Sequence, residues 1–187
     1  MWVDVETTGL NSEKDTIIEL AAICPDTGAE FHEYCLPAYK PADYEIIEAL
    51  TGITWEWLKA NGKKEIVLLY DFIRFLDTLV DKYNVKDKMI FAGFNTSFDN
   101  NFVRALFARN QDKYFGSYFF NILLDIYPFI AEKIISGQIE VFDNYRLSTL
   151  CEYFGIKFKA HSAIEDVKAE MLLYQKVKNL KKSVKKK

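Results

Sequence analysis

The segment WVDVETTGL, at residues 2–10, places two carboxylates one residue apart at the start of an apolar run. Residues i and i+2 of a β-strand point to the same face, so Asp4 and Glu6 would lie side by side on such a strand. Like charges a few ångströms apart repel each other, and the repulsion grows when they are buried. Either the segment is not a strand, or a positive group lies between the two carboxylates.

The remaining pattern of apolar residues favours an α/β fold. Half of the 187 residues are hydrophobic and 16% are aromatic, which excludes a disordered chain and provides enough apolar surface for a core. Short apolar runs between turn signals predict strands at residues 2–6, 16–24, 30–37 and 88–95. Apolar residues at helical spacing predict helices at residues 43–60, 63–80, 98–110, 128–136, 147–154 and 163–181. This order predicts a three-strand antiparallel meander within a mixed β-sheet flanked by helices.

We expect residues 1–180 to form one domain, because no linker or repeat divides them. The last seven residues, KKSVKKK at 181–187, contain five lysines, and we expect a disordered basic tail. The alternative is an electrostatic arm that contacts phosphate backbones. The net charge of −3 is only a weak argument against a nucleic-acid partner.

The sequence contains no signal for a membrane or for secretion. Its apolar runs are all shorter than the roughly 20 residues of a membrane span, and no secretory signal is visible. The three cysteines, Cys24, Cys35 and Cys151, lack the spacing of metal ligands and are interpreted as reduced, buried thiols. These features predict a cytoplasmic protein with no membrane partner.

A third carboxylate occurs in the segment FAGFNTSFDNNF. Ser97 is a candidate N-cap of the helix that follows, which would place Asp99 in the first turn. A carboxylate at this position interacts favourably with the helix dipole, so Asp99 alone does not indicate a functional site.

A fourth carboxylate lies in AHSAIEDVKAEM, where Ser162 and Glu165 have the spacing of a capping box. If Ser162 is the N-cap, Asp166 is the fourth residue of the helix and His161 lies just outside it, on a loop. The other histidine, His32, lies in the middle of a predicted strand and is interpreted as structural.

Four carboxylates on one strand and two helix starts would repel strongly if the fold brought them together. Two divalent cations would balance their charge, and a set of oxygen ligands suits Mg²⁺ or Mn²⁺ better than zinc. A pair of such ions is the arrangement used for in-line displacement at phosphorus. The paired charges of the first strand are therefore interpreted as part of a metal site.

The segments DVETTG, NTSFD and HSAIED resemble, in order and spacing, the three motifs of the DEDD exonuclease superfamily. The spacing of the last motif resembles the DEDDh branch, which includes bacterial proofreading subunits, ribonuclease T and oligoribonuclease. The resemblance covers residues 2–174 and implies a ribonuclease H-like mixed sheet. It implies that Asp4, Glu6, Asp99 and Asp166 bind two divalent cations, Mg²⁺ or Mn²⁺, and that His161 is the general base.

The resemblance also implies a reaction, the release of nucleoside 5′-monophosphates from the 3′ end of single-stranded nucleic acid. By the same resemblance, the candidate substrate-binding residues are Thr7, Leu10, Leu50, Thr51 and Asn95. For Leu10 and Leu50 the alternative is ordinary packing. The chain departs from many relatives in having Phe94 where they have histidine.

The identity of the polymer stays open, because no residue indicates a contact with a 2′-hydroxyl. DNA is favoured, and the alternatives are a 3′–5′ exoribonuclease or a catalytically idle nucleic-acid-binding module. A DNA polymerase, or another replication or repair protein, is a candidate partner, although a free-standing enzyme is favoured. The oligomeric state is not predicted.

Overall fold

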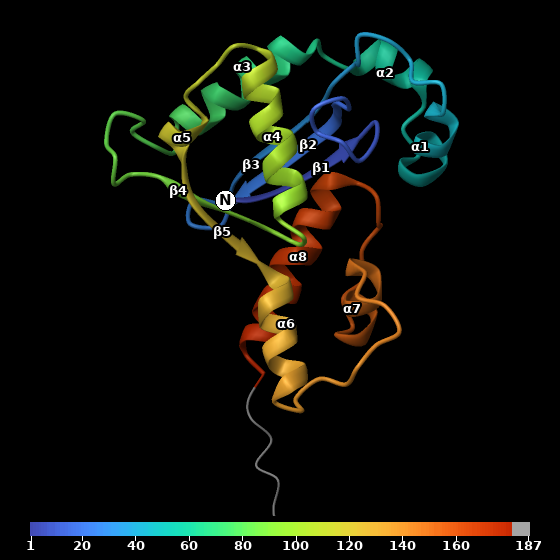
Figure 1. Ribbon diagram of the computed structural model, residues 1–187, viewed down its shortest axis with the longest axis vertical. Coiled ribbons are helices and arrows are strands. Elements are labelled where there is room, and N and C mark those ends of the chain that lie inside the picture. Colours follow the sequence, from blue (N-terminus) through green and yellow to red (C-terminus); the bar gives the residue numbers. More distant parts are fainter. Residues whose placement is uncertain (181–187) are drawn as a thin grey trace, which may run out of the picture.

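The computed structural model describes residues 1–180, so the tail expected at residues 181–187 lies outside the described part. Five strands form one mixed sheet in the order β3-β2-β1-β4-β5 (Figure 1). They are β1 (Trp2–Thr7), β2 (Ile17–Cys24), β3 (Ala29–Tyr34), β4 (Met89–Gly93) and β5 (Phe119–Asp125). The pairs β1–β2 and β2–β3 are antiparallel, whereas β1–β4 and β4–β5 are parallel. The predicted α/β class and the antiparallel meander are confirmed.

The helices largely follow the predicted ranges. They are α1 (Tyr44–Thr51), α2 (Trp55–Asn61), α3 (Glu65–Asp77), α4 (Ser97–Arg109), α5 (Phe115–Tyr118), α6 (Ile126–Ile135), α7 (Leu147–Tyr153) and α8 (Ala163–Lys178). The single helix predicted over residues 43–60 is wrong. Gly52 has a left-handed φ of 73° and ends α1, and the Thr54 side chain then caps α2 by accepting from Trp57 N.

Strand β5 and the short helix α5 were not predicted. The β5 sequence, FFNILLD, does not alternate between apolar and polar residues, and α5 leads into it without a turn signal. The strand matters for the site because it ends at Asp125. The Asp125 side chain caps α6 by accepting from Tyr127 N.

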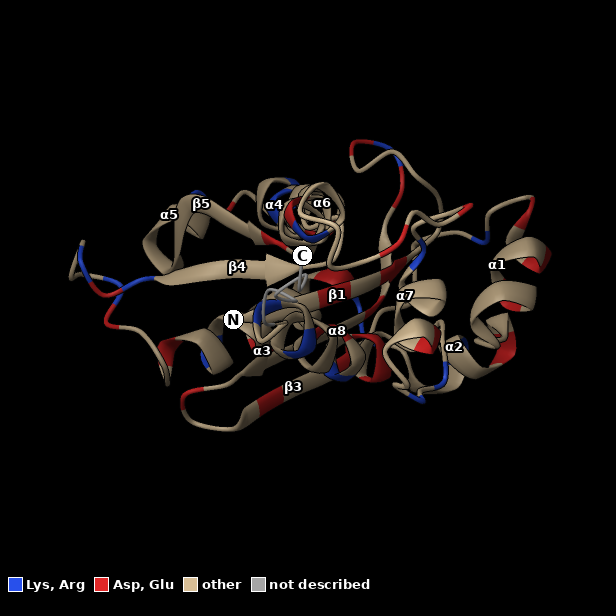
Figure 2. Cartoon of the chain, turned by 90° about the horizontal axis from the view of Figure 1, so that it is seen from below, with Lys and Arg blue, Asp and Glu red and all other residues tan. Residues whose placement is uncertain are grey.

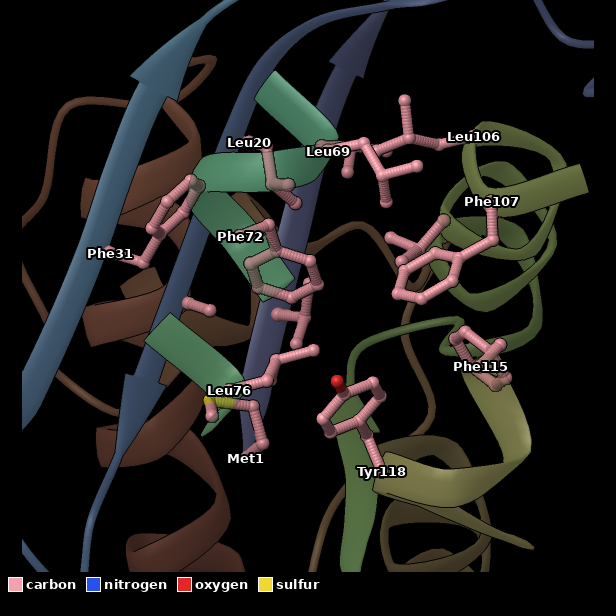
Figure 3. Close-up of a cluster of buried hydrophobic side chains, with 14 of the residues drawn as sticks. Met1, Leu20, Phe31, Leu69, Phe72, Leu76, Leu106, Phe107, Phe115 and Tyr118 are labelled. Carbon is pink, nitrogen blue, oxygen red and sulfur yellow. The ribbon is translucent and has the colours of Figure 1, made fainter. Parts of the chain in front are cut away.

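Helices cover both faces of the sheet. On one face, α3 and α4 pack with Val3 and Val5 of β1 into a large apolar cluster. Figure 3 shows this cluster, with Phe72 of α3 lying between the sheet and α4. On the other face, α6, α7 and α8 pack around Trp2.

The alternation along β1 directs its two carboxylates. Val3 and Val5 face α3 and α4, whereas Trp2 faces α8, so Asp4 and Glu6 also lie on the α8 side. Figure 2 shows acidic positions on β1 and on the adjacent α8. The strand assignment of residues 2–6 is therefore correct, and the repulsion between the two carboxylates is real.

Two further expectations concern the whole chain. Cys24, Cys35 and Cys151 are buried free thiols, as interpreted from the sequence. No helix within residues 1–180 is both long and apolar enough to cross a membrane.

Candidate active site

The site begins where β1 and β4 separate. These strands are paired only at Trp2 and Ala92. Beyond that pair, the backbone N–H of Val5 donates to Asp99 Oδ1 at 3.1 Å. The Asp99 side chain thus accepts the β1 hydrogen bond that a neighbouring strand would otherwise accept. It joins the start of α4 to the middle of β1. In mixed and parallel sheets, the carboxyl ends of the strands are the usual place for a ligand.

The start of α4 is fixed by Thr96, not by Ser97 as predicted. Thr96 is the N-cap residue, its Oγ1 donates to Leu124 O at 2.9 Å, and its N–H donates to Asp125 Oδ2 at 2.9 Å. The predicted position of Asp99 in the first turn is confirmed. The end of β5 therefore holds the helix that carries Asp99.

Asp166 comes from α8, on the opposite side of the sheet from α4. Ser162 is the N-cap residue, as predicted, but the predicted capping box is not formed. Asp166 Oδ2 accepts from the Ser162 N–H at 3.1 Å, which is the contact that a capping box would give to Glu165. Glu165 instead pairs with Lys168 at 3.4 Å. The Asp166 carboxylate is held by the same turn that carries His161.

His161 is exposed on the loop before α8 and has a φ of 64°, a left-handed conformation that costs energy for a residue with a side chain. Asn95, between β4 and α4, has a φ of 56°. These are two of only three non-glycine residues with positive φ in residues 1–180, and both line the same cavity. Such strain commonly marks functional loops.

The cavity has a volume of about 580 Å³ and brings together the residues of all three acidic segments. It is lined by Asp4, Val5, Glu6, Leu50, Phe94, Asn95, Phe98, Asp99, Tyr127, Arg146, Leu147, Ser148, Phe158, Ala160, His161, Asp166 and Glu170. A second cavity of about 190 Å³ shares His161 and is lined also by Glu19, Thr51 and Ser162.

The candidate substrate-binding residues do not all reach these cavities. Leu50 and Asn95 line the large cavity, and Thr51 lines the smaller one. Thr7 Oγ1 donates to Gly9 O at 2.6 Å, and Leu10 is 89% exposed. Within residues 1–180, neither Thr7 nor Leu10 is among the residues that line the two cavities.

Burial raises the pKa of every acidic group in the large cavity, and the neighbouring carboxylates raise it further. The pKa of Glu6 is raised to about 8 by burial and by Asp166, and that of Asp4 is raised well above its ordinary value. Burial raises the pKa of Asp99 to about 8 against the opposing hydrogen bond from Val5 N, and raises that of Asp166 to about 7. A positive charge placed among these carboxylates would therefore stabilise their ionised forms.

No lysine, arginine or histidine of residues 1–180 forms an ion pair with any of these cavity carboxylates. Asp4, Glu6 and Asp166 can each offer one oxygen such that the three atoms lie within 4.8 Å of one another. Mg²⁺ holds its ligands at about 2.0–2.1 Å, so any two ligands lie at most about 4.2 Å apart. Small side-chain rotations would give this distance, and the three residues fit a divalent cation.

Three acidic residues in or near the two cavities were not found from the sequence. Glu170 is buried and lies one helical turn beyond Asp166, a spacing that could have revealed it. Glu19 lies opposite Glu6 in the β1–β2 pair, is 1% exposed, and accepts a contact of 2.7 Å from His32 Nε2. This contact supports the structural interpretation of His32. Asp125 could not be placed because β5 was not predicted.

Aromatic and basic residues line the cavity together with the acids. Phe94 and Tyr127 lie with their ring centroids 4.4 Å apart, and Phe98 and Phe158 also line the cavity. Arg146 is exposed at the start of α7 and reaches the same cavity. Aromatic faces and a guanidinium group are the groups that contact bases and phosphates in single-stranded nucleic acids.

Comparison with protein families identifies one match across most of the chain. The model of the RNase_T family, described as an exonuclease, matches residues 1–174. Among curated proteins, the DNA polymerase III PolC-type of Bacillus subtilis (strain 168) is 31% identical over 185 residues, which cover 93% of this chain. The protein of the same name from Halalkalibacterium halodurans is 33% identical over 183 residues, or 94% of this chain. The chain spans only 11% of the length of each of these relatives.

Solved structures of exonuclease I have the same fold. One such structure superposes with a TM-score of 0.78 at 24% identity and covers 96% of this chain and 40% of its own. The complex of E. coli exonuclease I with a dA16 oligonucleotide has a TM-score of 0.75 at 24% identity, with coverage of 96% and 40%. The predicted fold of a ribonuclease H-like mixed sheet is confirmed by these neighbours.

Proposed function

Because the chain belongs to the RNase_T family of exonucleases, we propose that it is a metal-dependent 3′–5′ exonuclease that releases nucleoside 5′-monophosphates from single-stranded nucleic acid. The observation that carries the proposal is the convergence of carboxylates from β1, α4 and α8 in one cavity together with His161. In residues 1–180 these acids have no cationic partner, although burial and mutual repulsion act on all of them.

In this proposal Asp4, Glu6, Asp99 and Asp166 hold two divalent cations, Mg²⁺ or Mn²⁺. When bound, such ions lower the pKa of an attacking water and screen the charge that develops at phosphorus. Asp99 and Asp166 are each fixed by a backbone N–H, from Val5 and Ser162 respectively. These hydrogen bonds leave one further oxygen on each carboxylate for a cation.

His161 is the group that we propose accepts the proton of the attacking water. It lies on an exposed loop, lines the acidic cavity, and is joined through Ser162 to the turn that holds Asp166. An imidazole is suited to proton transfer near neutral pH. Its left-handed backbone directs the residue out of the line of α8, which begins two residues later at Ala163.

Substrate contacts follow from the cavity walls. Phe94 and Tyr127 offer aromatic faces to the terminal bases, and Leu50 and Asn95 also line the cavity. Arg146 is placed to contact a backbone phosphate. Thr51 is proposed to act from the smaller cavity, and Thr7 through the backbone turn that it stabilises. Leu10, at 89% exposure, would contact the nucleotide only as an exposed side chain of the loop after β1.

We propose DNA as the preferred polymer. This choice is supported by the names of the relatives, which are DNA polymerases III of the PolC type, and by the oligonucleotide in the exonuclease I complex. The alternatives are a 3′–5′ exoribonuclease and an idle binding module, but every acid expected from the resemblance lines the cavity. A DNA polymerase or another replication protein is the proposed partner class, since the matched relatives are polymerases many times longer than this chain.

The proposal is tested with single strands of DNA and RNA labelled at the 3′ or the 5′ end, incubated with Mg²⁺, Mn²⁺ or EDTA. Stepwise shortening of the 5′-labelled strand, immediate loss of the 3′ label, and no reaction in EDTA are expected. DNA should be degraded faster than RNA. A failure to cleave either polymer with both metals would contradict the proposal and favour the idle binding module.

A further inference from the structure

A fifth carboxylate, Glu170, lies beside the four acids to which the proposed function assigns the metals. It is on α8, one turn after Asp166, so the two side chains project from the same face of the helix. Glu170 is 1% exposed and lines the large cavity. It belongs to none of the three acidic segments DVETTG, NTSFD and HSAIED.

The two oxygens of Glu170 have different surroundings. Oε1 accepts from the backbone N–H of Phe94 at 3.1 Å and so joins α8 to the end of β4. Oε2 is completely shielded from solvent and has no hydrogen-bond partner in residues 1–180. It lies over Gly93, because a β-carbon placed on that glycine would come within 3.7 Å of it. The orphaned oxygen therefore lies at the carboxyl end of β4, beside the separation of β1 and β4.

A buried oxygen without a partner requires an explanation, since such groups are rare and costly in native proteins. Glu19 provides the contrast within the same molecule. It is equally buried, at 1% exposure, but its Oε1 is paired with His32 Nε2 at 2.7 Å. Glu170 has no such cation among the described residues, and the acids around it can only repel it.

We propose that Glu170 is an additional carboxylate of the metal centre, and that its Oε2 gains a partner only when a divalent cation enters the acidic cavity. Glu170 thereby raises the affinity for that cation, whereas Oε1 retains its structural contact with Phe94. The proposal rests on the proposed function, because it requires that the cavity bind divalent cations. It goes beyond that function by assigning cation affinity to a residue outside the four expected ligands.

The test is a titration of the full chain with Mn²⁺ alone, without nucleic acid, in which free Mn²⁺ is measured by electron paramagnetic resonance. Loss of a supporting partner around a metal typically weakens metal binding by about 10–100-fold. We expect Glu170→Gln to weaken Mn²⁺ binding by this factor. The control is Glu165→Gln on the same helix, where the carboxylate is half-exposed and paired with Lys168, and here the affinity should stay within about 2-fold of wild type.

A second measurement separates metal binding from a purely structural role. In EDTA, Glu170→Gln replaces a carboxyl group that lies among other acids and keeps the oxygen that accepts from Phe94 N. We therefore expect a melting temperature in EDTA equal to or above that of the wild type. A lower melting temperature in EDTA would assign Glu170 a structural role and overturn the proposal.

The outcomes distinguish this inference from the proposed function. If Glu170→Gln binds Mn²⁺ as tightly as wild type while Asp166→Asn does not, the inference is wrong and the proposed function stands. If the wild-type chain binds no Mn²⁺ at all, the metal-dependent function fails and the inference fails with it.

Discussion

Two buried regions of this molecule are built on opposite principles. The cluster between the sheet and helices α3 and α4 consists of apolar side chains, with Phe31 and Phe72 at a centroid distance of 5.1 Å (Figure 3). The acidic cavity gathers carboxylates from β1, α4 and α8 that repel one another. Burial of the apolar cluster stabilises the folded chain. Burial of the acids destabilises it unless a cation is present. The apolar cluster therefore stabilises the fold by itself, whereas the acidic cavity is favourable only with a bound cation.

The largest effect is expected for Asp166→Asn, which removes a proposed metal-ligand charge with little change in shape. Hydrolysis of labelled single strands should fall below detection, because the proposed reaction depends on the bound cations. Stability in EDTA should be unchanged or increased, since Asp166 is buried among like charges and its pKa is raised to about 7. The control is Asp143→Asn, at an exposed acid that does not line the cavity. Normal degradation by Asp166→Asn would refute the metal assignment.

His161→Ala should separate catalysis from metal binding within the same cavity. Removing a general base typically costs about 10²–10⁴-fold in rate. We expect turnover to fall by this factor, while Mn²⁺ affinity stays near that of wild type because no carboxylate is changed. Single-turnover rates and an Mn²⁺ titration check both parts. Unchanged turnover would exclude His161 from the proton transfer.

Phe72→Ala tests the apolar cluster, where we expect a loss of stability without a loss of turnover. Phe72 is fully buried between β3 and α4, and truncation of such a side chain typically costs about 3–5 kcal/mol of unfolding free energy. We expect that loss in urea unfolding, with little change in turnover per folded molecule. Because Phe72 lines neither of the two cavities around His161, a large fall in turnover at full folding would break the division between the two regions.

The sequence predicted the elements whose pattern is local. The alternation of β1 placed Asp4 and Glu6 on one face, and the serine before α8 marked the start of that helix. Strand β5 was missed because its sequence does not alternate, and the break between α1 and α2 depends on the left-handed conformation of Gly52. Local pattern thus carries most of the fold, but not an edge strand or a turn set by a single φ angle.

The candidate site was predictable to a similar degree. Short segments and a resemblance predicted Asp4, Glu6, Asp99, His161 and Asp166 as site residues, and all five line one cavity. Glu170 was missed although its one-turn spacing after Asp166 placed it on the same face of the helix, and only the fold shows its contact with the distant Phe94 N–H. The capping box was wrongly predicted for a similar reason. The Ser162 N–H was expected to donate to Glu165, and it donates to Asp166 instead. Which carboxylate takes a given N–H is decided by three-dimensional packing.

A further expected effect is a change of stability with pH in the metal-free protein. The pKa of Glu6 is raised from its ordinary 4.5 to about 8, and that of Asp166 from 3.8 to about 7. At pH values between the ordinary and the raised pKa of each group, the folded chain keeps a proton that the unfolded chain has released. The unfolding free energy therefore falls as the pH rises. The stabilisation is complete below about pH 4 and is lost by about pH 8. Since one pKa unit corresponds to about 1.4 kcal/mol, we expect a loss of at least that size.

Urea unfolding in EDTA at pH 5 and pH 8 measures this slope, and Mn²⁺ supplies the comparison. With Mn²⁺ at pH 8 the lost stability should return, because a cation that binds only the folded state stabilises it by mass action. Phe72→Ala should lower the unfolding free energy equally in EDTA and in Mn²⁺, and its change with pH should stay that of the wild type. Asp166→Asn should make the unfolding free energy in EDTA depend less on pH. A slope of the opposite sign in the metal-free protein would mean that the carboxylates are ionised and compensated in the folded state. The acidic cavity would then resemble the apolar cluster in being stable without a ligand.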